Sequence, residues 1–239
     1  MALVTGGSRG MGAAIARSLA RAGADVALTY HSSKEQAEAV AEQIDGLGRR
    51  GLAIAADSAD AEAVQDAVGR TVRELGRLDI VINNAGIFPY GPIEQTSLDE
   101  VDRTIAIHVR APFLAARAAV PHLGEGGRII TIGSNLADRA SGGGMVLYIM
   151  TKAANQGLTR ALARELGPRG ITVNLIQPGP TDTDMNPADS PRADAQRAAM
   201  ALGEYASVDD IATAVRYLAG PAGRQITGST LTIDGGNNA

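Results

Sequence analysis

Short apolar runs alternate along this chain with longer segments in which apolar residues recur every three or four positions. The short runs are typical of strands buried on both faces, and the periodic segments are typical of amphipathic helices. The runs that predict strands lie at residues 2–4, 25–29, 52–56, 78–82, 128–133, 171–176 and 231–233. The alternation predicts an α/β fold, a single domain over residues 1–239 in which helices cover both faces of a doubly wound parallel sheet.

Polar residues predict where several helices begin. Capping patterns of the form Ser-x-x-acid or Ser-x-x-Gln occur at Ser32, Ser33, Ser97 and Ser207. Pro112 predicts a bend in the helix that follows Ser97, because proline cannot donate the helical hydrogen bond. Residues 186–206 show no clean period before a short helix near 194–202, and we interpret this segment as a lid over a substrate site.

Net charge, cysteine content and the length of the apolar runs narrow the class of protein. The 239 residues carry a net charge of −4 without a basic block, which predicts neither a nucleic-acid partner nor an anionic-membrane partner. The chain has no cysteine, which excludes a disulfide, a thiolate metal site and a cysteine nucleophile, and we expect no metal. It has no apolar run of membrane-spanning length and begins within the first predicted strand, so we expect a cytoplasmic protein.

A glycine-rich turn joins the first predicted strand to the next helix. Its glycines are Gly6, Gly10 and Gly12, and Ser8 and Met11 lie between them. Glycines let the backbone approach a pyrophosphate, and the helix amino terminus supplies free N–H groups and positive potential. The spacing is G-x-x-x-G-x-G rather than the standard G-x-G-x-x-G, and a tight turn that needs positive φ is the alternative. The position between strand and helix favours phosphate binding.

The end of the second predicted strand distinguishes two dinucleotides. An NAD site places a carboxylate there, whereas residues 29–33 contain none. Arg9 could pair with a 2′-phosphate, and Ser32 or Ser33 could donate hydrogen bonds to it. The alternatives are a solvent-exposed arginine and two helix caps. We predict NADP(H) as the cofactor.

Two further segments follow the third and fourth predicted strands. Asp57, with Ser58 after it, either accepts a hydrogen bond from the adenine amine or caps the next helix. Residues 83–86, Asn-Asn-Ala-Gly, either form an ordinary turn or brace the central strand beside the cofactor ribose. Because the carboxyl ends of parallel strands meet at the ligand-binding edge of a sheet, we expect cofactor contacts from Asn84, Ala85 and Gly86.

Tyr148 and Lys152 lie four residues apart at the start of a predicted helix, so their side chains share one face. A lysine ammonium beside a phenol favours the phenolate and lowers its pKa, which suits acid–base chemistry. Ser134 follows the fifth predicted strand and is expected at the same edge of the sheet. The three groups are therefore predicted to converge on one substrate oxygen. The alternative is a solvated Tyr–Lys face and a turn serine.

In combination these motifs resemble the short-chain dehydrogenase/reductase family. They follow the family's order along almost the whole chain: Thr5-Gly-x-x-x-Gly-x-Gly12, Asn83-Asn-Ala-Gly86, Ser134, Tyr148-x-x-x-Lys152 and Pro178-Gly179. Residues 127–130, 170–174 and 227–236 resemble the 3-oxoacyl-acyl-carrier-protein reductase group. Residues 167–172, 177–180 and 183–187 are also similar to the branch that contains a cyclic-di-GMP-binding biofilm dispersal mediator. The resemblance implies a Rossmann-type fold, an NADP(H) cofactor and assembly as a homotetramer or homodimer.

The resemblance also implies roles for individual residues. Tyr148 is implied to protonate the carbonyl oxygen during reduction, and Ser134 to position that oxygen. Lys152 is implied to hold the nicotinamide ribose and to lower the Tyr148 pKa, so both Tyr148 and Lys152 also contact the cofactor. Further contacts near the nicotinamide are implied for Pro178, Gly179, Thr181 and Thr183.

Three features depart from the family pattern. His108 stands where the family has an asparagine that supports a proton-relaying water, and it either relays protons as a neutral imidazole or only fills the core. Fourteen positions separate Ser134 from Tyr148, a slightly longer interval than usual, through a glycine run at 141–144. Ile149 follows the tyrosine where small residues are common, and it either reshapes the pocket or fills core.

The sequence thus predicts an NADPH-dependent oxidoreductase that reversibly reduces the carbonyl of a small molecule, a ketone or a 3-oxoacyl compound. The alternative is a regulatory protein of the same fold that binds a cyclic dinucleotide with little or no turnover. No charged cluster marks a polar substrate, so a hydrophobic carbonyl compound is favoured. Met200 and Leu202 of the predicted lid are expected to form an apolar pocket wall, with a packed surface helix as the alternative.

Overall fold

Seven parallel strands form one sheet at the centre of the computed structural model, which describes residues 1–239, in the order β3-β2-β1-β4-β5-β6-β7. The strands are β1 (Ala2–Val4), β2 (Val26–Tyr30), β3 (Gly51–Ala55), β4 (Ile80–Asn83), β5 (Arg128–Ile132), β6 (Thr172–Pro178) and β7 (Thr230–Ile233). Every residue of β1, β5 and β6 is buried, as expected for strands covered on both faces, whereas the edge strand β7 is largely exposed. The predicted α/β fold is confirmed, and each predicted strand is present within two residues of its predicted bounds.

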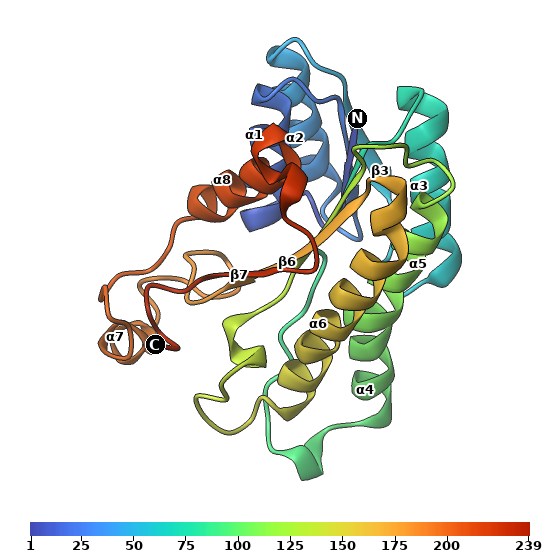
Figure 1. Ribbon diagram of the computed structural model, residues 1–239. Coiled ribbons are helices and arrows are strands. Elements are labelled where there is room, and N and C mark those ends of the chain that lie inside the picture. The colour runs from blue at the N-terminus through green and yellow to red at the C-terminus, as the bar shows by residue number, and fades with distance from the viewer.

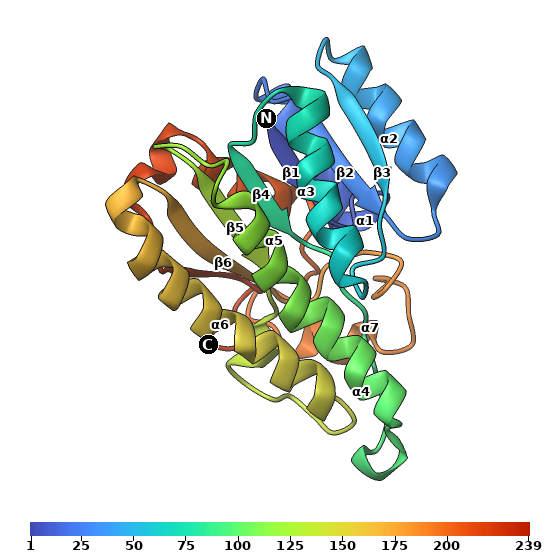
Figure 2. The same ribbon diagram turned by 90° about the vertical axis from the view of Figure 1, so that its right-hand side faces the viewer.

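Helices cover both faces of the sheet (Figures 1 and 2). One face carries α1 (Gly10–Arg21), α2 (Lys34–Gly46) and α8 (Val208–Ala219), and the other carries α3 (Ala61–Leu75), α4 (Leu98–Ile105), α5 (Ala111–Ala119) and α6 (Val146–Leu166). Each layer buries its own apolar cluster, centred on residues such as Ile15 and Leu28 on the first face and Val68 and Ile129 on the second. None of the helices is both long enough and apolar enough to cross a membrane.

Two of the predicted helix caps form and two do not. The Ser97 hydroxyl accepts a hydrogen bond at the start of α4, and Ser207 forms a reciprocal capping box at the start of α8. Ser33 stands at the cap position of α2, but its side chain makes no capping hydrogen bond. The cap of α3 is Asp60, which accepts from two backbone N–H groups, so the alternative that Asp57 caps this helix is wrong.

The bend predicted at Pro112 takes the form of a π-helical turn, Ala106–Arg110, between α4 and α5. Because Pro112 has no N–H, it cannot bond to the carbonyl oxygen of His108 four residues earlier. The side-chain amide of Asn155 on α6 donates to that oxygen instead, at 3.1 Å. The widened turn is therefore stabilised by a tertiary contact, and it places His108 beside the carboxyl ends of the strands.

Two neighbouring strands, β1 and β4, are joined by side-chain hydrogen bonds where they end. The side-chain amide of Asn84 donates to the carbonyl oxygens of Thr5 and Gly6, at 2.9 and 3.0 Å. In return, the Thr5 hydroxyl accepts from the backbone N–H groups of Asn84 and Ala85. The strand order reverses at this point, which is where open α/β sheets bind ligands. The Asn-Asn-Ala-Gly segment thus braces the central strands rather than forming an isolated turn.

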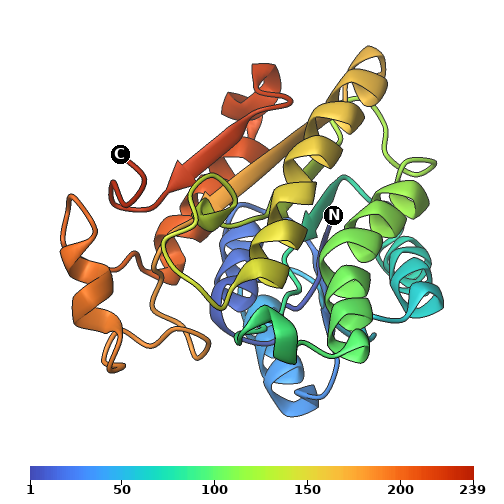
Figure 3. The same cartoon turned by 90° about the horizontal axis from the view of Figure 1, so that it is seen from below.

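The segment 186–206 stands away from the sheet and contains the short helix α7 (Ala193–Ala198) (Figure 3). Its carboxyl-terminal part is tied to the chain end, because the Leu202 N–H donates to the Gly235 carbonyl at 2.9 Å. Met200 is buried there, close to Gly235, and the Leu202 side chain is 71% exposed. Neither side chain lines the cleft described below, and both residues lie beyond the end of α7, so neither the pocket-wall expectation nor the packed-helix alternative describes them.

Candidate active site

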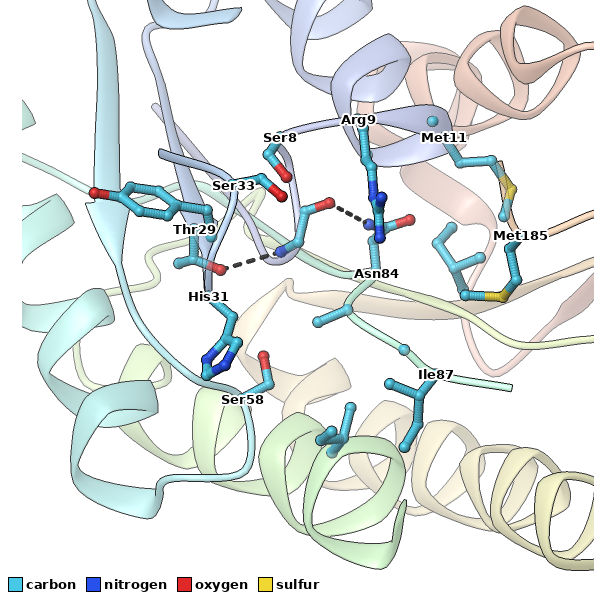
Figure 4. A pocket seen from close by; sticks show the side chains of 18 of the residues that line it. Ser8, Arg9, Met11, Thr29, His31, Ser33, Ser58, Asn84, Ile87 and Met185 are labelled. Atoms are coloured by element: carbon cyan, nitrogen blue, oxygen red, sulfur yellow. Dashed lines mark hydrogen bonds between the residues drawn. The ribbon is translucent and has the colours of Figure 1, made fainter. Parts of the chain in front are cut away.

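A cleft of about 480 Å³ lies at the carboxyl ends of the central strands (Figure 4). Most of the residues predicted to bind a cofactor line it: Gly6, Ser8, Arg9, Gly10, Met11, Gly12, Ser32, Ser33, Asp57, Ser58, Asn84, Ala85, Gly86, Tyr148, Lys152 and Thr183. Residues from six separate parts of the chain therefore meet in one cavity.

The glycine turn has the geometry of an anion cradle. Gly6 and Gly10 have φ values of +63° and +51°, which side chains rarely tolerate. A Cβ atom at Gly12 would collide with the carbonyl oxygen of Gly6. Helix α1 begins here with no side-chain cap and no acidic residue in its first turn, so its amino-terminal N–H groups and positive potential face the cleft. The turn needs positive φ and at the same time offers a phosphate site.

Arg9 lines the cleft, as do the two serines that precede α2. Its side chain is 62% exposed, and its Nη1 atom is 3.6 Å from a carboxylate oxygen of Asp184. An ion pair this long and exposed contributes little to folding stability. The guanidinium is therefore free to leave Asp184 for a stronger anion such as a phosphate monoester.

Asp57 lies in a cluster of charged side chains that lines the same cleft. Its oxygens accept from the Ala59 N–H at 2.9 Å and from Arg103 at 3.2 Å, and the Nδ1 atom of His31 is 3.3 Å away. Burial alone would raise the pKa of Asp57, but the bonds from Ala59 and Arg103 outweigh it and lower that pKa. An adenine amine bound here would donate a hydrogen bond to a carboxylate that already accepts from Ala59 and Arg103.

Tyr148 and Lys152 line the cleft, and Ser134, two residues after the end of β5, interacts with the Tyr148 phenol but is not one of the lining residues. Lys152 is buried on α6, and its Nζ atom donates to the Ile132 carbonyl at 3.0 Å and lies 5.7 Å from the centre of the Tyr148 ring. Ser134 is buried as well, and its hydroxyl accepts from the Leu136 N–H at 3.3 Å. The geometry favours convergence on one oxygen over a solvated Tyr–Lys face.

Burial shifts the pKa values of both Tyr148 and Lys152. It raises the pKa of the Tyr148 phenol, and interaction with the Ser134 hydroxyl opposes the rise. Burial lowers the pKa of Lys152 to about 8. The net Tyr148 pKa is therefore raised, because desolvation of the phenol dominates and the Lys152 ammonium donates to the Ile132 carbonyl. The expected lowering contribution of Lys152 stays a prediction.

His108 is only 2% exposed, and both of its ring nitrogens bond to protein groups. The Ile87 N–H donates to Nε2 at 3.0 Å, so the ring proton is on Nδ1, which lies 2.9 Å from the Thr151 hydroxyl oxygen. Burial, then the Lys152 charge, lower the His108 pKa to about 3. With no free lone pair for a water, the neutral ring fits the core-filling alternative better than the proton relay.

The residues that follow β6 divide into two groups. Thr183 lines the cleft, whereas Pro178, Gly179 and Thr181 do not. The Thr181 hydroxyl donates to the Gly179 carbonyl at 3.0 Å, and a Cβ atom at Gly179 would collide with Asp234. These three residues therefore do not line the cleft, and their contacts with the nicotinamide stay a prediction.

Sequence reasoning missed several residues of the cleft wall: Thr29, Tyr30, His31, Ala56, Ile87, Arg103, Ile107, Ile132, Gly133, Asp184 and Met185. Ala56 and Gly133 come directly after β3 and β5, so the rule that ligands bind at the carboxyl ends of parallel strands could have found them. Arg103 and Ile107 reach the cleft from α4 and the π-helical turn, and no local sequence signal marks them.

Replacing His108 is expected to change how stability depends on pH. Because the folded protein holds this pKa at about 3 rather than 6.5, unfolding takes up a proton below pH 6.5, and stability falls as the pH drops from 6.5 toward 3. Between pH 6.5 and 4.5, His108→Asn should lose about 2 kcal/mol less free energy of unfolding than the unsubstituted protein. Urea unfolding at the two pH values measures the difference.

His122→Asn is the matched control, because His122 is exposed. It should leave the pH dependence unchanged. If His108→Asn also leaves it unchanged, the neutral, buried state of His108 is refuted.

Comparison with known proteins agrees with this geometry. The family described as Enoyl-(Acyl carrier protein) reductase matches residues 6–238. The cyclic-di-GMP-binding biofilm dispersal mediator protein of Escherichia coli (strain K12) is 43% identical over 98% of this chain and 94% of its own length. A short-chain dehydrogenase/reductase of Cladobotryum sp is 40% identical over 98% of this chain and 94% of its own length. The crystal structure of a short chain dehydrogenase from Burkholderia cenocepacia J2315 in complex with NADP, 57% identical, superposes with a TM-score of 0.99 over 100% of this chain and 97% of that one. The chain therefore belongs to the short-chain dehydrogenase/reductase family.

Proposed function

We propose that this protein is an NADPH-dependent reductase that converts the carbonyl group of a ketone or 3-oxoacyl compound to an alcohol, in a reversible reaction. One observation carries the proposal: Tyr148 and Lys152, with Ser134 beside the phenol, line the same cleft as a glycine-rich anion cradle. One cavity thus offers both a binding site for a phosphate-bearing cofactor and an acid–base group.

The residues of the cleft fit NADP(H). The uncapped start of α1 and the glycine turn suit the pyrophosphate, and Arg9 with the nearby serines suits the 2′-phosphate. Elsewhere in the cleft, buried Lys152 uses only one of its three N–H groups within the protein, which leaves donors for ribose hydroxyls. The Burkholderia relative, crystallised with NADP, supports the same choice. When bound, the cofactor supplies the hydride.

The protein's own groups hold the substrate oxygen and move its proton. Tyr148 is protonated at neutral pH because burial raises its pKa, so it acts as the general acid in the direction of reduction. Ser134, beside the phenol, donates a second hydrogen bond to the same oxygen. Lys152 holds a positive charge below about pH 8, which stabilises the phenolate left after proton transfer. His108 has no proton-transfer role in this scheme.

Tyr148→Phe is the first test of the reductase. Removing the phenol hydroxyl should lower kcat for carbonyl reduction by about 10²–10⁴-fold, with little change in NADPH affinity. NADPH oxidation is followed by absorbance over a panel of ketones and 3-oxoacyl thioesters, and cofactor binding by calorimetry. Turnover that survives in Tyr148→Phe contradicts the assignment of the acid.

A second candidate function rests on the similarity to the biofilm dispersal mediator, whose name describes a cyclic-di-GMP-binding protein. In that case the chain binds a cyclic dinucleotide and turns over little or nothing. The same experiment separates the two candidates, because the regulatory function predicts no carbonyl reduction by either protein. A calorimetric titration with cyclic-di-GMP, with and without NADPH, then shows saturable binding.

Cofactor preference tests the role of Arg9. Arg9→Ala should raise KM for NADPH about tenfold and leave KM for NADH nearly unchanged, because only NADPH carries the 2′-phosphate. Asp184→Asn is the matched control: it removes the carboxylate that competes for Arg9, so KM for NADPH should stay equal or fall. Equal effects of Arg9→Ala on both cofactors would exclude the proposed contact.

We also propose that residues 186–206 act as a lid over the substrate. Residue Thr183 and the neighbouring Met185 line the cleft, so a bound cofactor contacts the chain just before this segment. Trypsin should therefore cleave after Arg192 and Arg197 more slowly when NADPH is present, with cleavage after Arg224, outside the cleft, as the internal reference. Equal resistance with and without NADPH argues against a lid.

We propose that this protein is cytoplasmic. We also propose that it binds further copies of its own chain, as a homotetramer or a homodimer. Large apolar side chains are exposed on the helix layer formed by α4, α5 and α6, namely Leu98, Ile105, Phe113, Val146 and Met150. The edge strand β7 is exposed as well. Both surfaces are of the kind that homo-oligomers bury.

A further inference from the structure

Aromatic side chains are rare in this chain, and three of them gather at the active site. The sequence contains two Phe, five Tyr and no Trp. Phe88 makes an edge-to-face contact with Tyr148, with ring centres 4.8 Å apart, and it stacks on Tyr90 with ring centres 6.2 Å apart and planes 18° apart. The three rings form a row that leads outward from the phenol of Tyr148.

Tyr90 joins three loops at the outer end of this row. It belongs to the loop after β4, and the next residue, Gly91, donates its N–H to the Gly144 carbonyl at 2.9 Å. Gly144 has a φ of +77°, and a Cβ atom there would lie 3.1 Å from the Tyr90 ring. The glycine run before Tyr148 is thus shaped to pack against this ring, which gives the long Ser134–Tyr148 interval a structural role.

The third loop contributes Arg192, from the lid segment. Its guanidinium carbon lies 4.4 Å from the centre of the Tyr90 ring, a cation–π contact. The Tyr90 side chain is nevertheless 55% exposed. A planar cation, a phenol and a phenyl ring therefore follow one another from residues 186–206 to Tyr148, and Tyr90 leaves part of its ring accessible.

We propose that Phe88, Tyr90 and Arg192 form a subsite that binds the planar aromatic group of an aryl ketone. The inference rests on the proposed reductase function and specifies its substrate class. A carbonyl oxygen held by Tyr148 places one substituent of the carbonyl carbon beside Phe88, because the two rings are in contact. A flat π-system gains binding free energy by stacking on the aromatic rings and on the guanidinium. A saturated ring gains binding free energy only from the burial of apolar area.

The test compares two ketones of the same carbon skeleton, acetophenone and cyclohexyl methyl ketone. Dissociation constants are measured by calorimetry with NADPH-saturated Tyr148→Phe protein, so that binding is read without turnover, and kcat/KM is measured with the active protein. The protein should prefer acetophenone in both measurements. Tyr90→Leu should reduce the aryl-to-cyclohexyl preference by about 3- to 10-fold, and Arg192→Met should also reduce it, because its methionine keeps an apolar stem but lacks the charge.

Two variants control for unspecific effects. Tyr90→Phe keeps the ring and should retain the preference. Tyr217→Leu removes a tyrosine of similar exposure, 50%, from α8, and should leave the preference unchanged.

The outcomes separate the two proposals. Reduction of ketones without an aryl preference, or a preference that Tyr90→Leu leaves intact, overturns the aryl subsite while the reductase stands. Absence of any ketone binding to the NADPH complex also overturns the subsite. Absence of carbonyl turnover by the active protein overturns the reductase function itself, whatever the binding measurement shows.

Discussion

The hydrogen bonds from Asn84 to the turn after β1 hold the two halves of the active site together. They join the glycine turn to residues 84–87, and Ala85 packs so closely on Gly6 that no side chain fits there. The same segment then places Gly86 beside Lys152 and His108, and directs the Ile87 N–H at the His108 ring. The position of the anion cradle relative to the acid–base group therefore depends on one half-buried amide side chain at the ends of two parallel strands.

Burial controls how many charges this site carries. Lys152 and His108 are both nearly inaccessible, and two cations side by side in a poorly solvated interior are strongly disfavoured. His108 resolves the conflict by staying neutral, with one nitrogen accepting from Ile87 and the other beside Thr151. A single cation, Lys152, then faces the phenol of Tyr148, so the electrostatic field at the reacting oxygen comes from one defined source.

Strand ends form one side of the active site, and loops form the other. Strand ends, glycines and backbone N–H groups form the cofactor side, and their positions follow from the sheet itself. On the side where we propose that the substrate binds, three loops meet at Tyr90 through a cation–π contact, a glycine contact and one backbone hydrogen bond. Such contacts are individually weak, so loop side chains can change substrate selection without disturbing the strand-end scaffold.

The sequence by itself determined the strands, their parallel arrangement and most of the residues at their carboxyl ends, because periodicity and strand-end position are local properties. It also identified Tyr148 and Lys152, whose shared helix face follows from four-residue spacing. Only the tertiary structure decided the protonation of Tyr148 and His108, since desolvation depends on residues far apart in the chain. It alone showed that Pro178, Gly179 and Thr181 are not among the residues that line the cleft. It also brought Arg192 onto Tyr90, a contact between side chains about a hundred residues apart that no local pattern encodes.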